Sequence, residues 1–172
     1  MNTKWDDLYA CMENGYLPIS AVEATGISRS YVTRFIDTHK KDLVKIRPGL
    51  YRNRAAFPDP FFEATYAIQR AILSHETALY LHGQWEDPLA ISSHLALYTD
   101  IPSPLTVTVP RGYNASHLRA RGLHVVTIPK EKWQADHTTV RTPFGHEVAC
   151  YTLERARNDV GIPTVDERIR GL

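Results

Sequence analysis

The segment 25-TGISRSYVTRFIDTHKKDLVKIRPGLYRN-53 decides the fold of the N-terminal part of this chain. Gly26 can adopt the positive φ of a tight turn, and Ser28 stands where a side chain can cap the next helix. Apolar residues then recur at offsets of three and four, which places them on one helical face. These residues are Val32, Phe35 and Ile36. The segment therefore predicts a tight turn followed by a short amphipathic helix.

Two short β-prone runs follow this helix, LVKI at 43–46 and LYRN at 50–53. The residues between them include Pro48, whose φ is fixed, and Gly49, whose φ is free. This combination favours a turn between two antiparallel strands. We expect a small β-hairpin after the helix.

Two more helices are expected upstream. Residues 2–13 carry apolar side chains at helical spacing, and the Asn-Gly pair at 14–15 is suited to end a helix. In PISAVEATG, at 18–26, Pro18 fits a first helical turn. Three helices with a tight turn between the second and third, closed by a hairpin, are the elements of a winged helix-turn-helix. We therefore expect such a domain in residues 1–56.

The proline-rich stretch FPDPF at 57–61 is interpreted as a domain boundary. Residues 61–83 have a helical pattern, in which Ser74 is expected to cap a helix and Gly83 to end it. Short β-prone runs then dominate, before a final helical pattern. The expected elements are strands at 105–110 and 123–129, a hairpin at 138–152 and a helix at 153–160. The remainder of the chain, 57–172, is thus expected to form a mixed domain, and the fold class is α+β.

The composition is that of an ordinary folded protein. The 172 residues are 43% hydrophobic and 23% charged, close to the averages for globular domains. No apolar run approaches the roughly 18 residues that span a bilayer, and the N-terminus lacks the order of a secretory signal. Cys11 and Cys150 are far apart, so we expect reduced thiols rather than a disulfide or a metal pair. We expect a cytoplasmic protein with no membrane partner.

The charge of the chain is unevenly distributed. The formal net charge is +1, yet the stretch from Arg29 to Arg54 holds eight basic residues and two acidic ones, which gives +6. A local excess of this kind favours a polyanionic partner, although a solvated surface can carry the same pattern.

The third helix and the hairpin supply the candidate DNA contacts. A helix that reads DNA presents a polar face to base edges, while flanking basic groups neutralise phosphates. Arg29 and Arg34 can contact either guanine or phosphate, and the short hydroxyl side chains allow the helix to approach closely. The candidates are Ser28, Arg29, Ser30, Tyr31, Thr33 and Arg34 on the helix, with Lys45, Arg47 and Arg52 on the hairpin.

No pattern for catalysis, metal binding or a cofactor emerges. His75 and His82 are seven residues apart, about two helical turns, which is too far for one zinc ion. The acidic residues Asp136 and Glu147 lack the nearby strand lysine of a nuclease. Phosphate-binding loops and nucleophile elbows are absent from the sequence. A pocket for a small molecule, lined by Trp85, Tyr98 and Trp133, is a further alternative, but scattered aromatic residues more often form a core.

Five stretches together resemble the AbiEi family of antitoxins, which belong to the type IV toxin-antitoxin systems of bacterial abortive infection. They are GYLPISAVEATGISRSYVTRFI at 15–36, PGLYRN at 48–53, SHETALYLHG at 74–83, TVTVPRGYN at 106–114 and YTLER at 151–155. The resemblance implies an N-terminal winged helix-turn-helix that binds repeats in the promoter of its own operon. It also implies a C-terminal domain that acts against a nucleotidyltransferase toxin, and therefore an autoregulating repressor with a role in phage defence.

The sequence departs from the family pattern near its end. Residues 156–159 are more polar than in the family, and the chain ends at Leu172, where the family has further helices. This second domain can therefore bind a toxin, form a dimer, or belong to a regulator without a toxin. Glu154 and Arg155 can form an ion pair with each other or contact a partner. The alternative function is a protein-interaction module whose DNA binding is incidental.

Overall fold

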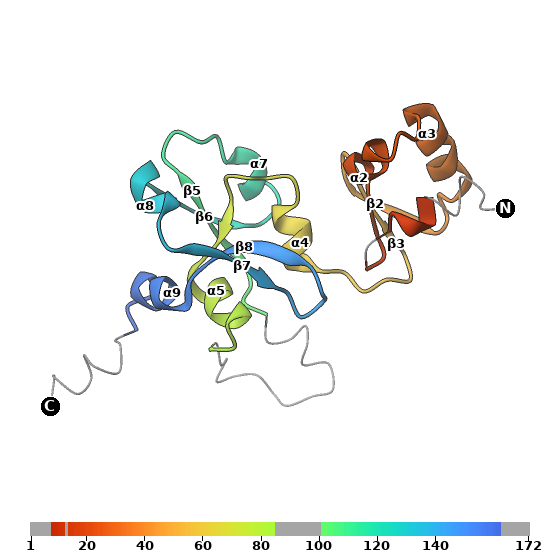
Figure 1. Cartoon of the computed structure of the whole chain (residues 1–172). Helices are drawn as coiled ribbons and strands as arrows, with labels where there is room; N and C mark the ends of the chain where they lie inside the picture. Colours follow the sequence, from red (N-terminus) through yellow and green to blue (C-terminus); the bar gives the residue numbers. More distant parts are fainter. Residues whose placement is uncertain (1–7, 13, 85–100, 163–172) are drawn as a thin grey trace, which may run out of the picture. The chain divides into compact units, whose positions relative to one another are not determined.

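The computed structural model describes residues 8–12, 14–84 and 101–162. The chain forms two compact units; along the sequence, the first ends at Asp59 and the second begins at Pro60 (Figure 1). The fold is α+β: a three-stranded antiparallel sheet lies in the first unit and a five-stranded mixed sheet in the second, both with short helices. Over these described ranges, no helix has the length and apolar character needed to cross a membrane.

The first unit combines short helices with a sheet in the order β1-β3-β2. Residues 8–10 are helical. The elements that follow are β1 (Tyr16–Pro18), α2 (Ile19–Ala24), α3 (Arg29–Thr38), β2 (Leu43–Arg47) and β3 (Leu50–Asn53). The expected third helix and hairpin are confirmed, and Gly26 has the positive φ, +80°, that the turn before α3 requires.

Strand β1 was not expected from the sequence. Pro18, which we placed in a helical turn, is the last residue of β1 and pairs with Leu50. Proline is tolerated there because β1 is at the edge of the sheet, where an amide hydrogen is not needed on the outer side. Tyr16 is fully buried, and its hydroxyl accepts a 2.7 Å hydrogen bond from the amide of Asp59. Pairing with β3 therefore decides the structure of these three residues.

The core of the first unit lies on the apolar face of α3. Val32 and Phe35 are almost completely buried, with 2% and 1% exposure, and Ile36 is half-buried. They pack with buried residues from the rest of the unit: Leu8, Leu17, Val22 and Leu43. Ser28 is the N-cap residue of α3, as expected, but its side chain makes no capping hydrogen bond and its hydroxyl lies 3.3 Å from that of Ser30.

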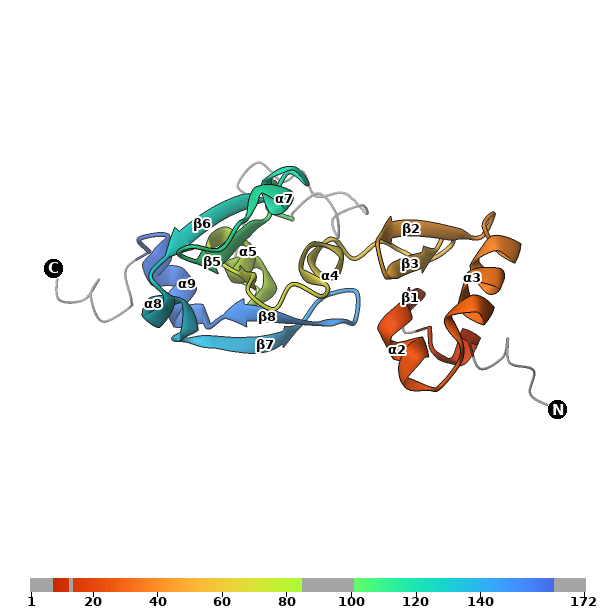
Figure 2. The same ribbon diagram turned by 90° about the horizontal axis from the view of Figure 1, so that it is seen from above.

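The second unit is built on a sheet in the order β6-β5-β4-β8-β7 (Figure 2). Strands β5 and β6 are parallel, β4 is antiparallel to β5 and parallel to β8, and β7 and β8 form an antiparallel hairpin. The elements are α4 (Pro60–Thr65), β4 (Ile72–Leu73), α5 (His75–Leu81), β5 (Thr106–Pro110), α7 (Ser116–Arg119), β6 (His124–Ile128), α8 (Lys130–Gln134), β7 (His137–Arg141), β8 (Glu147–Tyr151) and α9 (Leu153–Asp159).

The expected strands, hairpin and final helix of this unit are confirmed, but the helical expectation for 61–83 is wrong in its middle. Ile72 and Leu73 form the central strand of the sheet instead. A short apolar run does not by itself distinguish a buried strand from a buried helix. Ser74 is the N-cap residue of α5, as expected, but its side chain makes no capping hydrogen bond. The four- and five-residue helices α7 and α8 are too short to produce a periodic pattern.

A substitution at Gly15 tests the packing of the first unit. Gly15 has a φ of +83°, and an added Cβ would collide with the Cβ of Ala56, whereas Gly26 has a similar φ and open space around it. Gly15→Ala should lower the free energy of unfolding by about 3 kcal/mol, and Gly26→Ala by about 1 kcal/mol. Urea denaturation followed by NMR amide signals of this unit measures both. Equal losses would contradict the close approach to Ala56.

Candidate nucleic-acid interface

Helix α3 presents a polar face to solvent. Most candidate residues on and before this helix are exposed: Ser28, Arg29, Ser30, Thr33 and Arg34. Tyr31 differs, because it is half-buried and packs against the core. The Thr33 hydroxyl donates a 3.0 Å hydrogen bond to the carbonyl oxygen of Arg29, so its proton is used within the helix. The arginine side chains are thus the long polar groups that project from this face.

A groove of about 240 Å³ lies between α3 and the hairpin. Nine residues line it: Ile19, Arg29, Val32, Thr33, Ile36, Lys45, Pro48, Gly49 and Tyr51. Lys45 and Tyr51 are directly opposite each other in the antiparallel ladder of β2 and β3. None of these nine described residues is acidic, so the cations Arg29 and Lys45 share the groove with polar and apolar groups but with no carboxylate.

The three basic candidates of the hairpin differ in their exposure and in their contacts. Lys45 is exposed and lines the groove with Arg29 and Thr33. Arg52 is half-buried, and its Nη1 donates a 2.7 Å hydrogen bond to the carbonyl oxygen of Ala56. The Nε and Nη2 atoms of Arg47 are buried. The ladder shifts register between Lys45 and Arg47, and such an irregularity interrupts the alternation that would otherwise place both on one face.

Tyr51 is a groove residue that the sequence analysis missed. Its position opposite Lys45 follows from the hairpin register, which the two β-prone runs alone did not specify. The apolar residues Ile19 and Pro48 were also missed as groove residues, because they come from other parts of the unit. The structure thus assembles the groove from α2, α3 and both hairpin strands.

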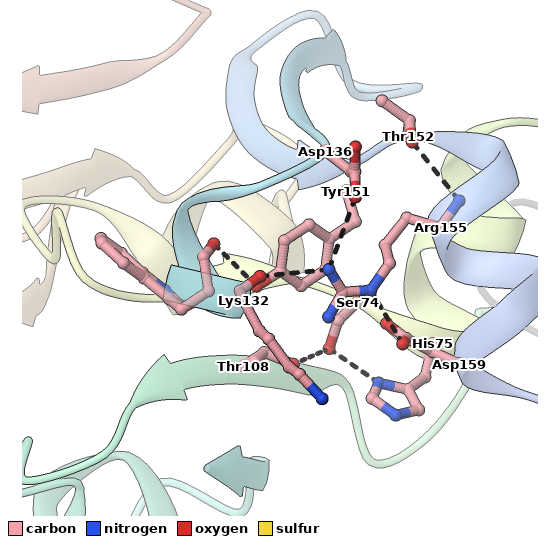
Figure 3. Close-up of polar contacts among 10 residues, drawn as sticks. Ser74, His75, Thr108, Lys132, Asp136, Tyr151, Thr152, Arg155 and Asp159 are labelled. Carbon is pink, nitrogen blue, oxygen red and sulfur yellow. Dashed lines mark hydrogen bonds and ion pairs between the residues drawn. The ribbon is translucent and has the colours of Figure 1, made fainter. Parts of the chain in front are cut away.

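The second unit contains a polar cluster around Arg155 (Figure 3). Its Nε donates a 2.9 Å hydrogen bond to Asp159 Oδ1, and its Nη1 donates to the carbonyl oxygen of Lys132 at 3.1 Å. Asp136 Oδ2 lies 3.8 Å from Nη1, and the guanidinium carbon lies 4.6 Å from the centre of the Tyr151 ring. The described ion pairs of Arg155 are therefore with these aspartates rather than with the neighbouring Glu154. The cluster connects α8, β8 and α9.

His75, the first residue of α5, and His82, its C-cap residue, contact different groups. His75 Nδ1 lies 3.0 Å from the hydroxyl of fully buried Ser74, which accepts a hydrogen bond from Thr108 (Figure 3). His82 Nε2 lies 2.8 Å from the carbonyl oxygen of Tyr151. Within 8–12, 14–84 and 101–162, no three His, Cys, Asp or Glu side chains are grouped to hold a metal ion. Trp85 and Tyr98, candidates for a small-molecule pocket, lie outside the described residues.

Removal of the Arg155 guanidinium should destabilise the second unit. Its side chain is 16% exposed and that of Asp159 is 19% exposed, so Arg155→Gln leaves a mostly buried carboxylate without this cation. We expect a loss of about 2 kcal/mol in the free energy of unfolding. Arg157→Gln on the same helix removes only an exposed contact to Gln84 and should cost less than about 0.5 kcal/mol. Urea denaturation compares them, and equal effects would contradict a structural role specific to Arg155.

The end of β8 should make the second unit sensitive to alkali. Burial raises the pKa of the Cys150 thiol from 9.0 to about 12 and that of Tyr151 from 10.0 to about 12, with Arg155 opposing the latter shift. The folded state therefore favours the neutral forms, and this stability is present below the unfolded pKa values and lost as the pH rises toward about 12. The urea midpoint of unfolding should therefore fall as the pH rises from about 9 to about 12. This fall should be less steep in Cys150→Ala, whereas in Cys11→Ala it should be as steep as in the unaltered chain. Identical slopes in all three proteins would contradict the contribution of Cys150.

No protein-family model matches this chain, and no curated protein matches it with significant similarity.

Proposed function

We propose that this chain is a transcriptional repressor that binds double-stranded DNA, and that its first unit acts as a winged helix-turn-helix. The order of its elements supports this proposal: a helical segment, β1, α2, α3 and the hairpin of β2 and β3. Helices α2 and α3 are joined by the four residues of 25–28, which include Gly26 with its positive φ. Turns of three or four residues with a glycine are typical of helix-turn-helix motifs.

In this function α3 enters the major groove, whose width of about 12 Å admits an α-helix. The observation that carries the proposal is the acid-free groove in which Arg29 and Thr33 of α3 lie beside Lys45 of the hairpin. A recognition helix next to a basic hairpin can contact base edges and phosphates at the same time. Short exposed side chains such as Ser30 favour a close approach of the helix to the bases. Arg34 is then a base-reading residue and Lys45 a phosphate contact.

The resemblance to AbiEi antitoxins supports the remaining parts of the proposal. It favours the chain's own promoter as the target, and a nucleotidyltransferase toxin as the partner of the second unit. The alternative of a protein-interaction module predicts a different dependence on salt. Phosphate contacts weaken steeply as salt is added, whereas a mostly apolar protein interface does not.

A mobility-shift titration against the upstream DNA and a scrambled duplex of equal length, at several salt concentrations, tests this function. Arg34→Ala should lose about 1 to 3 kcal/mol of discrimination between the duplexes, because one base contact disappears. Lys45→Ala should weaken binding to both duplexes equally, because phosphates are common to them.

Selective and salt-sensitive binding by the unaltered chain is the expected result. Equal binding to both duplexes, or none, would contradict sequence-specific repression and favour a protein-docking role. If Arg34→Ala weakened binding to both duplexes equally, only the assignment of Arg34 as a base-reading residue would be contradicted.

A further inference from the structure

We infer that the groove between α3 and the hairpin holds one sugar-phosphate unit of the DNA backbone, with Arg29 and Lys45 binding the same phosphate. This inference rests on the proposed function, because it takes duplex DNA as the ligand. It goes further by assigning a specific part of that ligand to a specific site.

The charges of the groove point to a single anion. Arg29 and Lys45 come from different elements, α3 and β2, and are the two charged residues among the nine that line the groove. Both side chains belong to exposed residues, so both can reorient toward a ligand. Two cations beside one small volume repel each other, and an anion between them converts this repulsion into attraction. No lining carboxylate competes with such an anion.

The apolar side chains among the lining residues distinguish a sugar-phosphate unit from a free phosphate. They belong to Ile19, Val32, Ile36 and Pro48, which line the groove together with Tyr51 and give it an apolar part beside the two cations. The carbon-bound hydrogens of a deoxyribose match such a surface, whereas a hydrated inorganic phosphate would gain nothing from it. The volume, about 240 Å³, is below the range of about 300 to 1,000 Å³ that holds small-molecule ligands. The groove therefore suits one segment of a polymer better than a complete metabolite.

This assignment separates the roles of the two arginines on α3. Arg34 does not line the groove, and it is five residues from Arg29, which corresponds to about 140° around the helix axis. Arg29 is thus a phosphate-binding residue that sets the position of α3 on the duplex. The residues that contact base edges are then Arg34 and its neighbours, on the other side of the exposed face of α3.

Single methylphosphonate substitutions along the upstream DNA test the shared phosphate, because each removes one negative charge. One position should weaken binding by the unaltered chain by about tenfold. The same substitution should cause a clearly smaller loss in Arg29→Gln and in Lys45→Gln, at that one position in both, because only one of the two cations then remains beside the phosphate. Lys40→Gln is the matched control: Lys40 is exposed and near the end of α3 but does not line the groove, so full sensitivity should remain.

Two results would overturn the inference while leaving the proposed function intact. Selective binding in which Arg29→Gln and Lys45→Gln lose sensitivity at different phosphates would show two separate contacts. Selective binding in which neither variant changes the methylphosphonate pattern would place the backbone outside the groove. Absence of selective binding by the unaltered chain would instead overturn the proposed function and this inference together.

A single ribonucleotide at the mapped position tests the sugar. Its 2′-hydroxyl would be brought against the apolar lining side chains, so binding should weaken several-fold, while the same change at a distant nucleotide should have no effect. Equal affinity for the two modified duplexes would contradict the placement of the sugar in the groove.

Discussion

The interface of the first unit depends on the burial of one side of α3. Val32 and Phe35 are held in the core with Leu17 of β1 and Leu43 of β2, and this contact directs the opposite face of a ten-residue helix to solvent. The same packing brings the start of α3 beside the hairpin, where the groove forms. Loss of this core would therefore remove both the exposed helix face and its position relative to Lys45.

Arg155 of the second unit and the groove cations of the first unit, Arg29 and Lys45, have opposite surroundings. In the second unit, Arg155 directs its guanidinium to Asp159, Asp136 and a backbone carbonyl, so its charge is satisfied inside the fold. In the first unit, Arg29 and Lys45 lie on a groove that contains no acidic lining residue. A charge with internal partners stabilises a structure, whereas cations gathered without a lining carboxylate suit an anionic ligand. This contrast is the electrostatic basis for placing the proposed DNA contact in the first unit.

Much of the fold could be predicted from the sequence, and the errors have a common cause. The apolar period of α3, the turn at Gly26 and the hairpin of β7 and β8 are local patterns, and the structure confirms them. Strands β1 and β4 were missed because they are two or three residues long and exist through pairing with distant strands. Residue 18 pairs with residue 50, and residue 72 with residue 108. No pattern within a few residues of Pro18 or Ile72 contains that information.

The candidate site could likewise be predicted only in part from the sequence. The sequence by itself determined which face of α3 is polar, because a helix with two buried residues at an offset of three must expose the side opposite to them. Only the tertiary structure decided which hairpin cations accompany that face. A register shift separates Arg47 from Lys45, Arg52 turns to the carbonyl of Ala56, and Tyr51 enters the groove by pairing with Lys45. Helical periodicity is encoded in neighbouring residues, whereas strand register and the partners of long side chains are set by packing between segments far apart in the chain.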